Sequence, residues 1–219
     1  SWDRVYNSSG RIVQDLDADP SDFNIQYGSV RNLGIVKSTD GGATWENALF
    51  INSTIAESGT CADVAISQND VILATMTNGR AYMSYDAGAT FEAISADKNL
   101  PTSGSNRTCV TISPSNPDVM YIMYVSQDIN NCFQYVYKST DAGDSWTKIL
   151  ESYPGFDPML SGGSGACQSV YDAAIHVSSV DPNTIYIGGI EIWRYDGNLT
   201  RIAHGFVGPL FADITPTYV

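Results

Sequence analysis

The sequence has little positive charge and almost no histidine. Its 219 residues include 11 Lys and Arg, 24 Asp and Glu, and 2 His, and the formal net charge is −13. A chain this acidic repels nucleic-acid phosphates and anionic lipid headgroups, so neither is expected as a partner. The sequence also lacks any apolar run of about 18 residues, so we expect no membrane insertion.

Charged residues of either sign are scarce, but apolar residues are not. Hydrophobic residues make up 43% of the chain and charged residues 16%. This balance is typical of a globular protein with a sizeable core. This composition excludes a long disordered tail.

What the sequence does contain is an internal repeat. Three octamers align without gaps on the pattern S-x-D-x-G-x-[ST]-[WF], and their aspartates lie 46 and 55 residues apart. A degenerate fourth copy at 193–199 keeps an aspartate another 55 residues on. The pattern residues are Ser38, Asp40, Gly42, Trp45, Ser84, Asp86, Gly88, Phe91, Ser139, Asp141, Gly143 and Trp146.

Each octamer lies between two short runs rich in Tyr, Val, Ile and Thr, and two more such runs lie upstream around a Pro, Asn or Asp turn. These residue types favour pleated, half-buried strands. Four strands in a repeat of about 45–55 residues are typical of a β-propeller blade. The sequence therefore predicts an all-β fold, a β-propeller of four-stranded antiparallel blades at 11–50, 61–94, 107–150 and 169–203.

The two ends are predicted to belong to further units. Ser1 and Trp2 match the last two positions of an octamer, so 1–10 is interpreted as the last strand of a preceding blade. Residues 204–219 are interpreted as a connection to a further blade. On this interpretation the whole segment, 1–219, is an incomplete part of one propeller domain.

The octamers resemble the Asp-box, or bacterial neuraminidase repeat, of sialidases, sortilin-type receptors, xyloglucan-hydrolysing propellers and secreted bacterial surface proteins. The resemblance covers nearly the whole chain in architecture and is specific for the fold, not for an activity. It implies that each octamer forms the hairpin between the third and fourth strands of a blade.

In such a hairpin each residue type has a structural task. The aspartates accept hydrogen bonds from backbone N–H groups of their own turn. The glycines allow a backbone conformation that a Cβ penalises, and the aromatic residues wedge between sheets. The repeated carboxylates are therefore expected to hold turns rather than to act as acids or bases.

Alternating strand direction sorts the connections onto two rims. The octamers share one rim with the Pro and Asn turns, and the opposite, loop-rich rim carries the long loops 52–61, 95–107, 126–132 and 151–168. Recognition is expected on the loop-rich rim. Arg31, Arg80 and Arg107 lie there as candidate binding residues that could clamp a carboxylate, as the arginine triad of sialidases does. The alternative is three solvated arginines, because the Arg-Ile-Pro signature of sialidases is absent.

The four cysteines also fall on the loop-rich rim. Three full pairings are possible, and neighbouring positions favour Cys61–Cys109 and Cys132–Cys167. The alternative is four buried free thiols. Disulfides would indicate an oxidising compartment, and zinc is not expected because the chain has no C-x-x-C motif and no nearby His pair.

No cofactor or metal site is predicted, although a calcium site is an alternative. Asp15, Asp17, Asp19 and Asp22 offer hard oxygen ligands within one short segment. The segment lacks the glycine and terminal glutamate of an EF-hand loop, which favours a solvated turn. His176 lies in an inner-strand run and is predicted to be a core residue.

Taken together, these features favour a non-enzymatic role. We expect a secreted or cell-surface propeller domain, on a bacterial exterior, that binds a glycan or protein on its loop-rich face or spaces other domains of a longer chain. The alternative is a glycoside hydrolase of sialidase or xyloglucanase type, with carboxylates on the loop-rich face or on further blades.

No catalytic residue can be assigned for that alternative. The carboxylates near the loop-rich rim are Asp63, Asp128, Asp157 and Asp172, and nothing in the sequence selects a pair among them. Candidate aromatic platforms for a sugar are Tyr124, Tyr153 and Phe156, although packing is the commoner fate of such residues.

Overall fold

The fold is all-β. The computed structural model describes residues 4–50, 61–128, 130, 132–153, 155–159 and 167–203, and within them four antiparallel sheets of four strands accompany one short helix, α1 (Ser169–Asp172). This confirms the predicted four-stranded antiparallel blades. We number the sheets blades 1–4 in chain order. Their strands are β1 (Val13–Ala18), β2 (Gln26–Val30), β3 (Gly34–Ser38) and β4 (Glu46–Phe50); β5 (Cys61–Ile66), β6 (Ile72–Met76), β7 (Ala81–Ser84) and β8 (Glu92–Ala93); β9 (Arg107–Ile112), β10 (Met120–Val125), β11 (Phe133–Ser139) and β12 (Thr147–Glu151); and β13 (Ala174–Val177), β14 (Ile185–Gly188), β15 (Ile192–Tyr195) and β16 (Leu199–Ala203).

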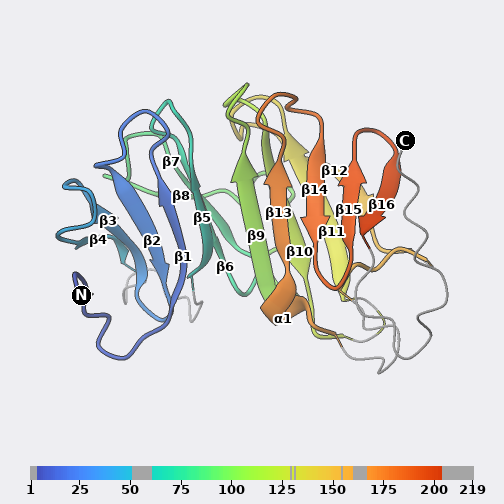
Figure 1. Cartoon of the computed structure of the whole chain (residues 1–219), viewed down its shortest axis with the longest axis horizontal. Helices are drawn as coiled ribbons and strands as arrows, with labels where there is room; N and C mark the ends of the chain where they lie inside the picture. Colours follow the sequence, from blue (N-terminus) through green and yellow to red (C-terminus); the bar gives the residue numbers. More distant parts are fainter. Residues whose placement is uncertain are drawn as a thin grey trace.

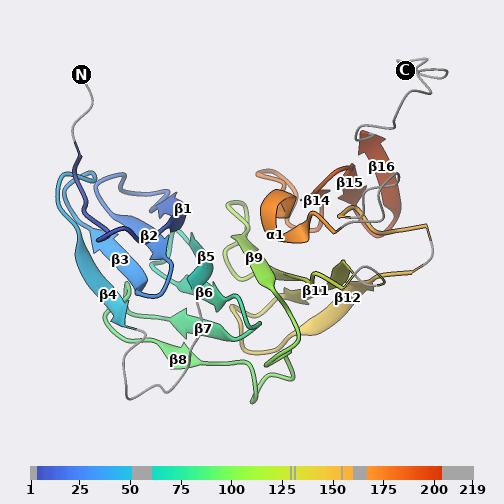
Figure 2. The same cartoon turned by 90° about the horizontal axis from the view of Figure 1, so that it is seen from below.

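The blades follow one another around an arc. Seen along the strands, β1, β5, β9 and β13 lie on the inner side of the arc, and β4, β8, β12 and β16 lie on the outer side (Figure 2). From the side, the chain advances from blade 1 at one end to blade 4 at the other (Figure 1). Each blade is a meander whose strands pair in sequence order, so every inner strand has one edge without a partner strand in its own sheet.

A strand is predicted for 1–10, but the described part of this segment, residues 4–10, contains none. Residues 4–12 lie outside the strands, and a turn in which Arg11 N donates to the Ser8 carbonyl, with positive φ at Ser9, interrupts the extended backbone. The Tyr6 ring instead lies 6.3 Å from the Trp45 ring of blade 1. Residues 1–3 and the predicted connection at 204–219 lie outside the described residues.

Apolar side chains fill the space between successive blades, and each interface has its own cluster. Burial of such side chains supplies most of the stabilisation, at about 1.5–3 kcal/mol for a large apolar side chain. The clusters centre on Tyr27, Ile35, Val64 and Ile72 between blades 1 and 2, on Leu73, Met83, Ile122 and Trp146 between blades 2 and 3, and on Tyr121, Phe133, Ile175 and Ile187 between blades 3 and 4.

The three octamers form hairpins that join the third and fourth strands of blades 1–3, as the Asp-box resemblance implies. In the second, Asp86 Oδ1 accepts from Thr90 N at 2.8 Å and Oδ2 accepts from the Thr90 hydroxyl at 2.6 Å. Ser84 Oγ donates to Asp86 and accepts from Gly88 N at 2.8 Å. The same bonds recur around Asp40 and Asp141. The aspartates thus accept hydrogen bonds from within their own turns.

The glycine of the third octamer, Gly143, adopts a backbone conformation that favours glycine. Gly143 has a φ of +90°, and a Cβ built on it would lie 2.2 Å from Met83 Sδ in blade 2. The hairpin therefore packs its backbone directly on the preceding blade. Substitution of Gly143 would meet both a backbone penalty and a steric one.

The degenerate fourth copy forms a different, tighter hairpin between β15 and β16. Asp196 accepts from Asn198 N at 3.2 Å and from Arg194 at 2.7 Å, and Gly197 has a φ of +99°. The serine two residues before the aspartate is replaced by Arg194, so the serine-centred bonds of the other hairpins are absent from this described turn.

One of the two favoured disulfides is present. Cys132 and Cys167 are bonded, which ties the start of β11 to the segment before α1. Cys109 is a buried free thiol, so its predicted pairing with Cys61 is wrong. The physical reason is the direction of its side chain, which points toward blade 4 and donates from Sγ to the Ala173 carbonyl at 3.3 Å. Burial raises the pKa of the Cys109 thiol to about 12.

Candidate functional site

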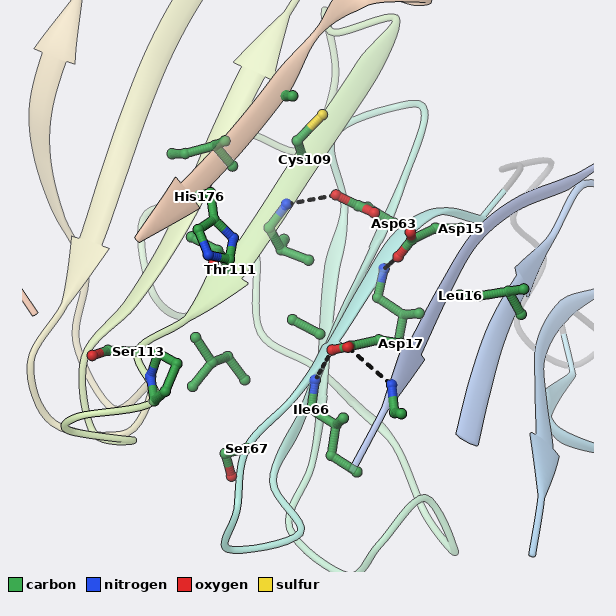
Figure 3. Close-up of a pocket in the computed structure, with 18 of the residues that line it drawn as sticks. Asp15, Leu16, Asp17, Asp63, Ile66, Ser67, Cys109, Thr111, Ser113 and His176 are labelled. Atoms are coloured by element: carbon green, nitrogen blue, oxygen red, sulfur yellow. Dashed lines mark hydrogen bonds between the residues drawn. The ribbon is translucent and has the colours of Figure 1, made fainter. Parts of the chain in front are cut away.

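The inner strands of the four blades line a polar cavity of about 400 Å³ (Figure 3). Because these strands lie at the inner edge of their sheets, their side chains converge from four blades onto one space. The polar and titratable lining residues that lie within the inner strands are Asp15 and Asp17 from β1, Asp63 from β5, Arg107, Cys109 and Thr111 from β9, and His176 from β13.

Most of these polar groups already bind the backbone of the next blade. An edge strand leaves N–H groups without a partner strand, and such groups must be satisfied by other acceptors. Here the side chains of the preceding inner strand accept them. The bonds run from Val64 N to Asp15, from Ile66 N to Asp17, from Val110 N to Asp63, and from Val177 N to Thr111, at 3.3, 2.9, 2.8 and 3.4 Å.

Two of the cavity carboxyl groups also contact each other. Asp63 hydrogen-bonds to Asp15, and Figure 3 shows the two groups side by side. Burial, followed by the adjacent charge of Asp15, raises the pKa of Asp63 well above its usual 3.8, although Val110 N and Arg107 act in the opposite direction. Two like charges in contact cannot both be stable, so Asp63 is best accommodated as a protonated donor to Asp15.

This pair predicts an unusual dependence of stability on pH. Folded Asp63 binds its proton more tightly than the unfolded chain does, so stability falls as the pH rises from about 4 through the raised pKa. The replacement Asp63→Asn imitates the protonated carboxyl. We expect its urea midpoint to match that of wild type near pH 4 and to exceed it near pH 8.

Asp86 has the opposite effect on the pH dependence of stability and acts at low pH. Hydrogen bonds from the Thr90 side chain and then the Thr90 backbone lower the pKa of Asp86 to about 2. Its contribution is present above pH 4 and is lost as the pH falls toward 2. A wild-type midpoint that stays level between pH 4 and 8 would contradict the Asp63 part of this account.

The three candidate arginines do not converge. Arg107 lines the cavity, but its guanidinium donates to the carbonyls of Val170 and Tyr171 at 3.0 and 3.3 Å and so ties β9 to α1. Arg31 follows β2 and is exposed, and Arg80 precedes β7; neither is part of the cavity lining. The described structure therefore does not assemble an arginine triad.

Other singled-out residues are placed differently from what the sequence suggested. Asp157 accepts from the backbone N–H groups of Cys132, Phe133 and Met159 and so fixes the start of β11. Tyr124 and Phe156 are fully buried and cannot be sugar platforms, whereas Tyr153 is half exposed. His176 is exposed toward the cavity, so its predicted core position is wrong.

The acidic segment that offers an alternative calcium site makes local hydrogen bonds. Asp19 accepts from the backbone and hydroxyl of Ser21, and Asp22 accepts from Asn24. In the described part of the chain, no group of three or more His, Cys, Asp or Glu side chains is arranged to hold a metal ion. The other two carboxylates of the segment, Asp15 and Asp17, accept the backbone N–H groups of Val64 and Ile66.

A second concavity, which we call the outer groove, lies between blades 2 and 3. It has a volume of about 470 Å³ and combines tyrosine rings with polar side chains. Lys148 lies 5.1 Å from the centroid of the Tyr135 ring, and the Tyr135 and Tyr137 rings meet edge to face at 6.2 Å. Its lining is Asn99, Leu100, Pro101, Ser103, Gly104, Gln134, Tyr135, Tyr137 and Lys148.

The hairpins, blades and disulfide agree with a family match over most of the chain. A family model described as "Sortilin, neurotensin receptor 3", Sortilin-Vps10, matches residues 34–169. The chain belongs to the Sortilin-Vps10 family. The match begins at β3 and runs into α1, so it includes the three complete octamers.

Solved structures show that this Sortilin-Vps10 chain has a propeller fold. An ancestral GH74 enzyme superposes with a TM-score of 0.58 at 15% identity, covering 87% of this chain and 25% of that one. YCF48 from Cyanidioschyzon merolae gives 0.61 at 16%, covering 94% and 60%. The WD40 repeats of RRP9 give 0.61 at 11%, covering 89% and 52%. At these identities the likeness concerns the fold alone.

The Sortilin-Vps10 chain thus spans between a quarter and three fifths of the length of these structural neighbours. No curated protein matches it by sequence. Among the described residues, no helix has the length and apolar character needed to cross a bilayer.

Proposed function

We propose that this chain is a non-catalytic binding domain of a secreted or cell-surface protein and that its ligand is a polypeptide segment. The observation that carries the proposal is the engagement of the cavity carboxylates. Asp15, Asp17 and Asp63 each accept a backbone N–H of the following blade, so their first task is to hold blades together.

The same observation disfavours the hydrolase alternative. A glycoside hydrolase needs two carboxyl groups about 5–10 Å apart, one on each side of the scissile bond. Asp15 and Asp63 are in direct hydrogen-bond contact and leave no room for a sugar between them. Asp157 is committed to three backbone N–H groups. Neither Asp15 with Asp63 nor Asp157 is therefore placed to act as such a pair.

The outer groove is the surface that supports binding best. Tyrosine is among the side chains enriched at the centre of protein–protein interfaces. Tyr135 and Tyr137 provide the rings, and Lys148, which is ion-paired with Glu151, lies over the Tyr135 ring. The family description, which names a neurotensin receptor, supports a peptide as the ligand class.

The Cys132–Cys167 bond supports an exterior location. Disulfides persist in oxidising compartments such as the periplasm, the cell surface and the medium, and are rare in a reducing cytosol. The bond joins the residue before β11 to the segment before α1.

The test is a binding screen of the purified chain against a displayed random-peptide library and, in parallel, against xyloglucan oligosaccharides. We expect peptide binding that weakens about tenfold in the Tyr135→Ala protein, as for a central interface aromatic. The Tyr171→Ala protein is the control, because Tyr171 is 75% exposed and lies on α1. Release of reducing ends from xyloglucan, or selected peptides that bind Tyr135→Ala as tightly as wild type, would contradict the proposal.

A further inference from the structure

Blades 3 and 4 repeat one row of side chains on the face that packs against the blade before them. Residues that pair directly across the strands of a sheet share a face, so each row can be followed from the inner to the outer strand. The row is Val110, Ile122, Tyr137 and Lys148 in blade 3, and Ile175, Ile187, Trp193 and Arg201 in blade 4. Each row begins with two apolar side chains of the inter-blade core and ends with a large aromatic ring and a cation.

The cation at the end of each row lies over an aromatic ring and is paired with a glutamate. In blade 4, the Arg201 guanidinium lies 5.7 Å from the centroid of the Trp193 ring and 3.0 Å from Glu191. In blade 3, Lys148 lies over the Tyr135 ring in the same way and is also paired with a glutamate. The outer ends of these two interfaces are thus built from the same kinds of side chain.

At the interface between blades 3 and 4, the chain itself covers the aromatic ring of the row. Phe156, in the loop after β12, is fully buried and meets the Trp193 ring edge to face, with the centroids 5.2 Å apart. The same loop is held on blade 4 through the Pro158 carbonyl, which accepts from Ile190 N at 2.9 Å. A phenylalanine carried by a loop therefore occupies this end of the interface.

The interface between blades 2 and 3 has no such ring. No aromatic residue occurs between Phe91 and Tyr121, so the corresponding loop, after β8, brings none to Tyr137. That loop contributes Leu100 to the core, and the outer groove lies between the loop and the rings of Tyr135 and Tyr137. The groove volume of about 470 Å³ falls within the range of ligand pockets, about 300–1,000 Å³, so it has room for a ring. Blades lie on both sides of this interface in the described chain.

Tyr137 is held in a fixed position beside the groove. The fully buried Tyr124 meets Tyr137 edge to face at 5.7 Å, and Tyr135 meets it edge to face at 6.2 Å. Because these contacts already order the ring, binding a ligand against it costs little further conformational entropy. The interface between blades 2 and 3 thus has the receiving ring of the next interface without the ring that packs on it.

We propose that the outer groove selects an aromatic side chain of a separate polypeptide, which packs edge to face on Tyr137 as Phe156 packs on Trp193. This inference rests on the proposed function and narrows it from any polypeptide to a segment with one aromatic anchor. Aromatic rings prefer this geometry because their edges are positive and their faces negative, and an aliphatic side chain lacks that attraction. The repeat favours a polypeptide over a glycan, because a polypeptide side chain occupies the equivalent place in the next interface.

The first test is selection of displayed random dodecapeptides on the 219-residue chain, followed by calorimetry with synthetic copies. We expect the peptides that lose affinity for the Tyr135→Ala protein to share one Phe, Tyr or Trp. Replacing that residue by leucine should weaken binding about fivefold, and replacing it by alanine more than tenfold. On the protein side, Tyr137→Leu should weaken binding about fivefold, whereas Tyr137→Phe, which keeps the ring, should stay within about twofold of wild type.

A pair of neighbouring tryptophan variants tests the location. Ser103 lines the groove and Thr102 does not, and both residues are exposed. The Ser103→Trp protein supplies a ring to the groove from its own chain, so its peptide affinity should fall at least tenfold. The Thr102→Trp protein should bind as wild type does. The urea midpoints of both proteins should stay near that of wild type, which separates a filled groove from a lost fold.

The outcomes distinguish this inference from the proposed function. Groove-dependent peptides without a shared aromatic residue, or equal affinities of the Ser103→Trp and Thr102→Trp proteins, would overturn the inference and leave peptide binding standing. A selection that yields no binding peptide would overturn both. Binding of xyloglucan oligosaccharides that is lost in the Tyr137→Leu protein, with no peptide selected, would identify a glycan site and also overturn both.

Discussion

Replacing Trp146 by alanine is expected to lower the free energy of unfolding by about 3–5 kcal/mol. The Trp146 ring is only 9% exposed and lies in the apolar cluster between blades 2 and 3. Its Nε1 also donates to the Gly143 carbonyl at 3.1 Å, so the indole is hydrogen-bonded to the backbone of its own hairpin. Loss of the side chain leaves a cavity between two sheets and an unpaired carbonyl, so both the packing and the turn are weakened. Urea unfolding followed by circular dichroism measures the change.

Trp45 is the matched control for this prediction. It occupies the same position of the first hairpin and makes the same bond, from Nε1 to the Gly42 carbonyl at 2.9 Å. Trp45 is only partly buried, and its aromatic neighbour is Tyr6 of the segment before β1. The Trp45→Ala protein should therefore lose clearly less stability than Trp146→Ala. Equal losses would show that the bond to the glycine carbonyl, rather than burial between blades, sets the cost.

Removal of the Cys132–Cys167 bond is expected to cost about 4 kcal/mol, because the bond closes a loop of substantial length in the unfolded chain. The sequence separation of the two cysteines is 35 residues. In the chain-entropy model, such a crosslink acts mainly by restricting the unfolded ensemble. The Cys132→Ala/Cys167→Ala protein should unfold at a lower urea concentration, and a reductant should shift wild type in the same direction.

The third described cysteine provides the control for the disulfide. Cys109 is buried and unbonded, so the Cys109→Ala protein should keep the reductant response of wild type. A wild-type midpoint that does not move in dithiothreitol, while mass measurement shows two free thiols released, would contradict the stabilising role of the bond.

The hairpins could be predicted from the sequence because each is local. Asp86 binds a residue four positions away, and its serine and glycine partners lie within the same octamer, so the pattern carries the whole geometry. The blades followed from the same reasoning, because a meander pairs strands that are adjacent in the chain. The local hairpins and the sequential pairing of strands were enough to predict the fold class, although they say nothing about how one blade packs on the next.

The contacts between blades could not be predicted in the same way. Asp63 and Val110 are 47 residues apart, and their hydrogen bond depends on the register of two strands in different sheets. The sequence did contain a signal for these contacts, because Asp15 and Asp63 occupy the same position in successive inner strands. The calcium and hydrolase hypotheses considered each aspartate separately and so missed this repetition. The wrong partner for Cys109 has the same origin, because its side chain faces the following blade rather than the preceding one.

The central claim is that the repeated carboxylates of this propeller hold its turns and blades and leave ligand recognition to other surfaces. Its most direct test is the urea midpoint of the Asp86→Ala protein near pH 7, measured beside its affinity for a selected peptide. The account predicts a lower midpoint with an unchanged m-value, and unchanged affinity for the folded protein. A wild-type midpoint combined with lost peptide affinity would contradict it.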